Sequence, residues 1–309
     1  MMTLRNYFII LITALLPGIL NAAEDLSSQP TVKTFIKEMS HKHHFDQKKL
    51  SLLFDQVHLR PTVMQNIQQP LEKKPWYLYR LLFVTNQRVQ HGVQFWKKNQ
   101  DALNAAYRKY GVPPSIIVAT IGIETKYGKD VGHYRVIDAL SSVAFSKSPR
   151  APFFRRELEE YLLLAREKHF DPLISKGSYA GAMGLPQFMP DSYRRYAVSY
   201  SGHSQPDLYL NEADVITSVA NYYHAHGWVR HQPIATPTVS LGLQKKIPEN
   251  EKEAYGRTLT LENYFTREYW KTYHNFDVIK KYNTSDLYAM AVYHLSEKIT
   301  LKKKKADAI

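Results

Sequence analysis

Apolar residues recur every three or four positions along most of this chain, which is the spacing of an amphipathic helix. Two such segments follow one another from Thr31 to Val57, and a longer one runs from Trp76 to Tyr110, where Gly111 ends it. Shorter helical patterns cover residues 114–126, 136–145, 153–166, 191–198, 212–226 and 286–299. The pattern therefore predicts a mainly α-helical protein.

Polar and apolar residues alternate only late in the chain. Residues 236–241 and 258–261 show this alternation, which is typical of half-buried β-strands. We expect a small β insertion at residues 233–265, so that the fold class is mainly α with an α+β character. The other expected parts are an N-terminal helical lobe (24–110), a central core (111–232) and a C-terminal helical segment that completes a cleft (266–309).

Residues 1–23 have the features of a secretory signal peptide. Arg5 supplies the positive start, residues 7–20 are apolar, and small residues follow them. The apolar run is too short for a membrane span. We expect cleavage near Ala22 or Ala23, export, and no stable membrane insertion afterwards, with an uncleaved anchor as the alternative.

The composition narrows the partners and the chemistry. Lys and Arg number 41 against 28 Asp and Glu, so the formal net charge is +13, and such a surface attracts polyanions. The sequence contains no compact nucleic-acid-binding motif, so we expect no nucleic-acid partner. The chain has no cysteine, which excludes disulfides, thiolate catalysis, cysteine-bound zinc and a lipidated cysteine. We interpret the lysine-rich stretch 298–305 as a solvated tail.

Glu124 is the strongest catalytic candidate. It follows the apolar run from Ile116 to Ile123, where an ionised carboxylate is poorly solvated. Desolvation raises the pKa of a carboxyl group, so Glu124 can stay protonated near neutral pH and donate its proton. The alternative is a structural glutamate at a helix end that reaches solvent or pairs with Lys126 or Lys129.

A second catalytic acid is not evident. Most glycosidases use two carboxylates that flank the scissile bond. The acids nearest to Glu124 in sequence are Asp130 and Asp138, and Asp138 lies in a helical pattern where an ion pair or a turn cap is expected. The sequence therefore favours a mechanism that needs a single acid and base.

Residues 177–190 are rich in glycine and small residues and suit close contact with a polar ligand. Ser178 and Gln187 offer donors and acceptors for an N-acetyl group or sugar hydroxyls. The alternatives are a helix cap for Ser178 and a backbone hydrogen bond for Gln187.

Three other segments are weaker candidates for a functional site. Residues 282–288 contain an asparagine and two tyrosines that would edge a cleft, although a helix cap followed by a core tyrosine explains them as well. Residues 199–207 have the outline of a calcium loop without its alternating carboxylates. The histidines of residues 41–44 are interpreted as a solvated turn rather than a metal site.

Five separated blocks together resemble one known family. They are residues 121–128, 135–140, 177–190, 219–228 and 281–292. In type and order they resemble the lytic murein transglycosylase B family, over roughly residues 30–300. The resemblance implies that residues 111–232 form a lysozyme-like catalytic core, flanked by the helical lobe and the small β insertion.

The resemblance also implies a function. The expected enzyme is a peptidoglycan lytic transglycosylase that cleaves the β-1,4 bond between N-acetylmuramic acid and N-acetylglucosamine, with Glu124 as its only general acid and base. The substrate-binding positions that it implies are Ser178, Gln187, Phe188, Tyr222, Tyr282, Asn283, Tyr288 and Arg150. Pro149 stands in place of a second arginine. A hydrolysing muramidase and a non-catalytic peptidoglycan-binding or assembly protein are the alternatives.

Two departures from the family change the expected ligands and location. The family's calcium loop corresponds to residues 199–214, where Ser199 and His203 replace acidic ligands and only Asp214 is matched. We therefore expect weak or no calcium binding, no other metal and no cofactor. Typical members are lipoproteins, whereas this chain lacks cysteine, so a soluble periplasmic form is expected. Its partner would be peptidoglycan glycan strands, and other cell-wall enzymes stay open as partners.

Overall fold

The structure is a computed structural model that describes residues 25–68, 74–202, 205–238 and 257–308 of the 309-residue chain. The expected signal peptide lies outside these residues. The chain forms two compact units, one that ends at Gln56 and one that begins at Val57. No helix in the described part of the chain is both long and apolar enough to cross a membrane. The domain boundaries expected from the sequence stay a prediction.

The first unit is a helical hairpin. A 3₁₀ turn, η1 (Leu26–Ser28), precedes α1 (Pro30–His43) and α2 (Gln47–Phe54). Phe35 and Phe54 are almost fully buried and meet edge to face at 5.8 Å between ring centroids. Two helices are thus confirmed here, and the histidine cluster forms the last turn of α1 and its left-handed cap, His44.

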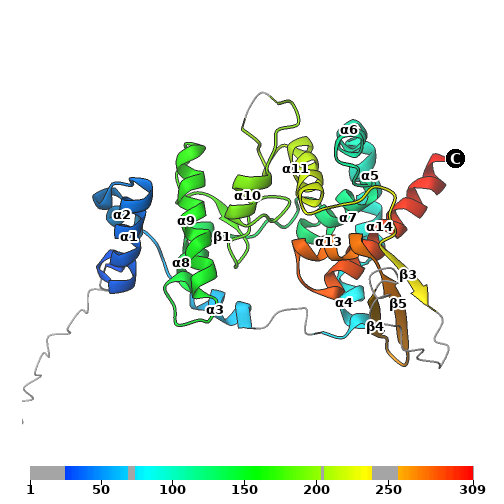
Figure 1. Cartoon of the computed structure of the whole chain (residues 1–309), viewed down its shortest axis with the longest axis horizontal. Helices are drawn as coiled ribbons and strands as arrows, with labels where there is room; N and C mark the ends of the chain where they lie inside the picture. Colours follow the sequence, from blue (N-terminus) through cyan, green and yellow to red (C-terminus); the bar gives the residue numbers. More distant parts are fainter. Residues whose placement is uncertain (1–24, 69–73, 203–204, 239–256, 309) are drawn as a thin grey trace, which may run out of the picture. The chain divides into compact units, whose positions relative to one another are not determined.

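The second unit contains most of the helices and two small sheets (Figure 1). Its helices are α3 (Pro61–Gln68), α4 (Trp76–Phe83), α5 (Asn86–Lys98), α6 (Gln100–Tyr110), α7 (Pro114–Thr125), α8 (Val136–Ala144), α9 (Ala151–Glu167), α10 (Pro190–Tyr196), α11 (Glu212–Ala225), α13 (His274–Tyr282) and α14 (Asp286–Asp307).

The long helix expected at Trp76 to Tyr110 is wrong, because the segment forms α4, α5 and α6. Thr85 starts α5 by accepting a hydrogen bond from the Arg88 amide at 3.1 Å. Asn99 ends α5 and precedes α6, and its side chain returns to the Phe95 carbonyl. Capping residues therefore divide the predicted helix into three, while the spacing of its apolar residues continues unchanged across the breaks.

Helix α7 forms the centre of the second unit. It packs against α5, α6, α11 and α14 (Figure 1), and every residue from Ile116 to Ile123 is buried. A helix that is apolar on all sides is expected to lie inside the protein. It ends where Lys126 adopts a left-handed conformation with φ of 52°. Its last turn, which carries Glu124, is therefore held by packing on several sides.

Helix α14 packs against α7, and also against α4, α5 and α13. It begins at Ser285, whose hydroxyl accepts hydrogen bonds from the amides of Leu287 and Tyr288. The predicted helix 286–299 is confirmed, and it continues through the lysines to Asp307. Four of the five lysines of residues 298–305 are exposed, so the expected solvated character of this stretch is confirmed, although the stretch is helical. The ion pair between Lys303 and Asp307, one helical turn apart, favours this continuation.

A three-stranded antiparallel sheet lies late in the chain, which confirms the expected β structure. Its strands are β3 (Ala235–Thr238), β4 (Arg257–Glu262) and β5 (Arg267–Thr272), in the order β3-β5-β4. Residues 239–241 of the first predicted strand lie outside the described residues. The strand β5 replaces the start of the predicted C-terminal helical segment, and it pairs through Trp270 with Pro237 and Leu259 on either side.

A shorter ribbon supports the glycine-rich segment. Strands β1 (Tyr134–Arg135) and β2 (Lys176–Gly177) pair antiparallel, so Tyr134 lies opposite Gly177. Met183 then bridges both Gly177 and Phe188. Residues 177–188 thus fold back on themselves next to the start of α8.

The buried carboxyl group of Glu157 on α9 makes the stability of the protein depend on pH. The side chain is only 6% exposed, and its Oε2 accepts a hydrogen bond from the Asp191 amide of α10 at 3.1 Å. Burial raises the pKa of Glu157 from 4.5 to about 7, although the amide opposes the shift. The folded state therefore holds an extra proton between these two pH values, and stability falls as pH rises through this window.

We expect Glu157→Gln to raise the free energy of unfolding by roughly 2–3 kcal/mol at pH 8, with little change at pH 5. Glutamine keeps an oxygen for the Asp191 amide but carries no charge to desolvate. Urea unfolding at the two pH values measures the difference. An equal effect at both would show that the carboxylate of Glu157 is not destabilised by its surroundings.

Candidate functional site

Glu124 and Tyr288 form the centre of the candidate site. Glu124 lies half-buried in the last turn of α7, and the Tyr288 hydroxyl donates a hydrogen bond to its Oε1 at 2.5 Å. Tyr288 is 2% exposed and lies in the first turn of α14, where the Ser285 cap holds its amide. Two packed helices therefore fix the pair, although 164 residues separate it in sequence.

The phenol groups around Glu124 are held neutral. Burial raises the pKa values of Tyr288 and Tyr282 well above the usual range, and the nearby Glu124 carboxylate adds to the shift. Burial raises the pKa of Tyr223 in the same direction. A neutral phenol is a hydrogen-bond donor, so Tyr288 stabilises Glu124 as a carboxylate, while the low solvation of the site opposes that charge.

A second buried tyrosine lies close to this pair. Tyr223 is fully buried on α11, near enough to Glu124 and Tyr288 for their charges to affect one another. The Tyr223 hydroxyl lies 2.8 Å from Thr120 Oγ1. Thr120 precedes Glu124 by four residues, so both side chains lie on one face of α7. Our sequence interpretation missed Thr120 and Tyr223, and the only local signal was this spacing.

An aromatic cluster lies beside Glu124 and Tyr288. The Phe188 ring lies 5.4 Å from the Tyr222 ring and 5.8 Å from the Tyr282 ring, measured between centroids. Tyr282 also stacks on Tyr288 with an angle of 13° between the ring planes. The structure thus brings together four of the predicted binding residues with Glu124.

The hydroxyl groups of two of these tyrosines bind the backbone. Tyr282 donates to the Pro186 carbonyl at 2.5 Å, and Tyr222 donates to the Lys281 carbonyl at 2.6 Å. The first bond attaches the glycine-rich segment to the end of α13. These hydroxyls therefore position the walls of the site.

Ser178 and Gln187 both hydrogen-bond nearby backbone groups, as the alternative for Gln187 predicted, but the helix cap given as the alternative for Ser178 is wrong. Ser178 Oγ accepts hydrogen bonds from the amides of Ala180 and Ala182, so it closes a local turn rather than a helix. The Gln187 side-chain amide donates to the Val131 carbonyl at 3.2 Å and to the Gly184 carbonyl at 2.9 Å. Both side chains hold residues 178–187 in shape, which is compatible with an additional contact to a ligand.

Asn283 and Arg150 have different surroundings. Asn283 follows α13, and its Oδ1 accepts a hydrogen bond from the Ser285 amide at 3.1 Å, so it helps to start α14. Arg150 is exposed before α9, and its guanidinium lies over the Phe154 ring at 5.1 Å. Arg150 makes this contact within its own helix rather than with the aromatic cluster.

The two acids nearest in sequence to Glu124 form ion pairs. Asp138 is fully buried and accepts hydrogen bonds from Arg135 at 2.7 Å and from Arg60 at 3.2 Å. Asp130 pairs with Lys126 at 3.1 Å. The expected ion pair of Asp138 is confirmed, and the position of Asp130 shows that Lys126 has a partner other than Glu124.

The loop of residues 199–214 is organised by Asp214. This carboxylate is 1% exposed, and it accepts hydrogen bonds from the amides of Tyr200 at 2.7 Å and Asp207 at 3.0 Å. His203 lies outside the described residues. Within the described ranges no group of three His, Asp or Glu side chains is placed to hold a metal ion. Weak calcium binding stays a prediction.

Comparison with known proteins identifies the family. The family model described as "Transglycosylase SLT domain" matches residues 27–297. The membrane-bound lytic murein transglycosylase B of Escherichia coli strain K12 is 38% identical over 92% of this chain and 86% of its own length.

Solved structures agree in fold. The soluble lytic transglycosylase SltB1 of Pseudomonas aeruginosa is 38% identical and aligns with a TM-score of 0.80 over 89% of this chain and 100% of its own. The Escherichia coli lytic transglycosylase Slt35 in complex with bulgecin A aligns with a TM-score of 0.82, at 38% identity, over 90% of this chain and 95% of its own. The expected fold, mainly helical and lysozyme-like with a small β insertion, is confirmed, and the chain belongs to the transglycosylase SLT domain family.

Proposed function

We propose that this protein is a peptidoglycan lytic transglycosylase, as its relatives are named, and that Glu124 is its only general acid and base. The bond cleaved is the β-1,4 bond between N-acetylmuramic acid and N-acetylglucosamine. The observation that carries the proposal is the pair of Glu124 and the neutral Tyr288 hydroxyl at 2.5 Å within an aromatic cluster. Asp130 and Asp138 are engaged by cations, which supports a mechanism with one acid.

The reaction has two proton transfers. Protonated Glu124 donates its proton to the glycosidic oxygen, the bond from C1 of the muramic sugar to that oxygen breaks, and positive charge develops at C1. The N-acetyl group of the substrate stabilises this charge, which makes a protein nucleophile unnecessary. The Glu124 carboxylate then accepts the proton of the C6 hydroxyl, and that oxygen bonds to C1. The product is a 1,6-anhydro end, and no water is consumed.

The surrounding residues have separable roles in this scheme. Tyr288 stabilises the carboxylate form of Glu124 between the two transfers. Tyr282 is partly exposed and supplies ring surface for a sugar, since aromatic faces pack against the apolar side of a pyranose ring. Phe188 and Tyr222 are buried and support the Tyr282 ring from behind. Gln187 uses its amide hydrogens on the backbone, so its Oε1 is the atom that would accept a hydrogen bond from a sugar.

Ser178 and Asn283 would place the backbone at the edges of the cleft, and Arg150 would attract the anionic peptide stems. We also propose that residues 1–23 are removed near Ala22 or Ala23 and that the mature protein works in the periplasm on glycan strands. The N-terminal lobe and the core keep the boundaries given from the sequence, whereas the β insertion extends to Thr272 so that it includes β5, and the C-terminal segment follows it. Other cell-wall enzymes remain candidate partners.

The mass of the product tests the reaction. Purified sacculi digested with the protein should release muropeptides that are one water lighter than those from a hydrolysing muramidase. Products of the heavier mass would favour the muramidase. Zymograms without clearing, from a protein that still binds sacculi, would favour the non-catalytic binding protein.

The hydrogen bond that Tyr288 donates to Glu124 should contribute to the rate of the reaction. Tyr288→Phe removes the donor to the carboxylate, so we expect kcat to fall about tenfold to a hundredfold. The ionised form of Glu124 loses a stabilising contact, so the basic limb of the pH profile of kcat should move to higher pH. Steady-state rates across pH measure both effects.

Tyr293→Phe on the same helix is the matched control, because it removes a half-buried phenol without a contact to Glu124 in the described structure. Its pH profile should match that of the wild type. A Tyr288→Phe profile that coincides with the wild type would remove Tyr288 from the catalytic scheme.

A further inference from the structure

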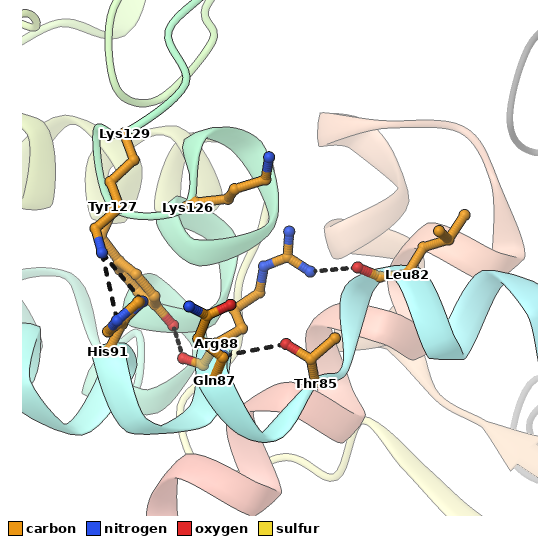
Figure 2. A pocket seen from close by; sticks show the side chains of 8 residues that line it. All are labelled: Leu82, Thr85, Gln87, Arg88, His91, Lys126, Tyr127 and Lys129. Atoms are coloured by element: carbon orange, nitrogen blue, oxygen red, sulfur yellow. Dashed lines mark hydrogen bonds between the residues drawn. The ribbon is translucent and has the colours of Figure 1, made fainter.

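A cationic cavity lies next to the C-terminal end of α7, where the mechanism above does not use it. Its volume is about 230 Å³, and its polar lining includes Arg88, His91, Lys126, Tyr127 and Lys129. Figure 2 shows these side chains converging from α5 and from the turn that follows α7. The cavity is smaller than the roughly 300–1,000 Å³ of sites for drug-sized ligands, so it suits a single charged group rather than a sugar ring.

Arg88 is the buried charge of this cavity. The residue is 7% exposed, and its Nη1 donates to the carbonyls of Leu82 and Phe83, both at 2.7 Å. Its Nε is buried and has no hydrogen-bond partner among the described residues. Burial lowers the pKa of the guanidinium from its usual range, because the charged form is desolvated. An anion beside this group would offset that cost.

Lys129 adds a second charge at the rim. Its Nζ lies 3.3 Å from His91 Nε2, so its partner is an imidazole ring rather than a carboxylate. Lys126 also lines the cavity, although it pairs with Asp130 at 3.1 Å. Among the described residues, Arg88 and Lys129 therefore line the cavity without a carboxylate partner, whereas Lys126 has one.

The backbone around the cavity is constrained. Lys126 and Tyr127 have φ values of 52° and 62°, which non-glycine residues rarely adopt. The Tyr127 hydroxyl donates to the Arg88 carbonyl at 2.9 Å and fixes this turn against α5. Rare conformations held by their surroundings concentrate at functional sites, so the constrained turn agrees with a binding role.

We propose that this cavity is a subsite for a free carboxylate of the peptide stem of peptidoglycan, which deepens the proposed function and rests on it. The reach is sufficient. The Cα atoms of Glu124 and Lys126 are at most about 7.6 Å apart, whereas an extended stem of four residues spans up to roughly 14 Å. A stem attached to a muramic sugar at Glu124 is therefore long enough to reach the turn that carries Lys126. Guanidinium and ammonium groups together bind carboxylates strongly.

Calorimetric titration at low salt tests the subsite. The probes are an N-acetylmuramoyl tetrapeptide with free carboxylates and its fully amidated counterpart. The wild type should bind the free form at least about tenfold more tightly, since a hydrogen bond to a charged group supplies about that factor. Lys129→Met should weaken the free form about tenfold and leave the amidated form unchanged. Arg88→Lys, which keeps the charge without the fork of donors, should also weaken the free form.

Lys302→Met is the control, since it removes an exposed lysine of α14 outside the cavity. Equal binding of both probes by the wild type would overturn the subsite, as would an equal loss in Lys129→Met and Lys302→Met. The proposed function is tested separately by the product mass. Anhydro products without carboxylate preference would reject the subsite alone, and carboxylate binding without cleavage of sacculi would reject the enzyme alone.

Discussion

Glu124→Gln should leave less than about a thousandth of the wild-type kcat on sacculi, because one group performs both proton transfers and general acid–base catalysis alone supplies about 10²- to 10⁴-fold. Glutamine has the same shape as protonated glutamate, and its oxygen can still accept the hydrogen bond from Tyr288. Binding of sacculi should therefore persist while turnover is lost. Release of anhydro-muropeptides, followed by mass spectrometry, measures the effect.

Glu297→Gln is the matched control, since Glu297 is exposed on α14 and the same change of charge is made outside the site. Its activity should equal that of the wild type. The thermal midpoints of all three proteins should agree, which separates lost chemistry from lost folding. Residual cleavage by Glu124→Gln above a few per cent would show that another group donates the proton.

The sequence predicted Glu124 because a local feature reveals it. A carboxylate that follows eight buried positions, of which only Thr120 is polar, marks the end of an internal helix, and α7 has that form. Tyr223 has no such signal. Its contacts to Thr120 and Tyr288 join residues far apart in sequence, and an adjacent pair of tyrosines in an apolar helix is equally typical of a core.

The secondary structure was likewise predictable where neighbouring residues determine it, and not where residues distant in sequence do. Apolar periodicity predicted most helices, since burial imposes it directly. It could not separate α5 from α6, because Asn99 interrupts the backbone and not the apolar period. The strand β5 was missed because Arg267 to Thr272 gain their sheet partners from β3 and β4, so pairing rather than pattern determines their conformation.

The alternatives for Ser178 and Gln187 illustrate a limit of motif reasoning. Both residues were expected at the ligand, yet in the structure their side chains hold the backbone of the glycine-rich segment. A polar side chain satisfies nearby backbone groups whether or not a ligand is bound. The shape of this segment is therefore part of the site, and its glycines are the sensitive positions.

Gly132→Ala should lower the free energy of unfolding by about 3–4 kcal/mol and greatly reduce activity. Gly132 has a φ of 93°, and a Cβ atom there would lie 2.0 Å from the Gly177 carbonyl oxygen and 2.5 Å from the Ser178 amide. These are backbone atoms, so no side chain can turn aside. Relief requires a shift of β2, which displaces residues 177–188 and with them Phe188 of the aromatic cluster.

Gly202→Ala separates the two causes of this loss. Gly202 has a similar φ of 73°, but apart from its chain neighbours no atom of the described residues lies within 4 Å of its added Cβ. We expect this variant to lose only about 1 kcal/mol, which is the cost of the left-handed conformation, and to keep its activity. Urea unfolding followed by tryptophan fluorescence measures both variants, because all four tryptophans lie beyond Val57 and report on the second unit. Equal losses in the two variants would mean that conformation, and not contact with Gly177, makes Gly132 necessary.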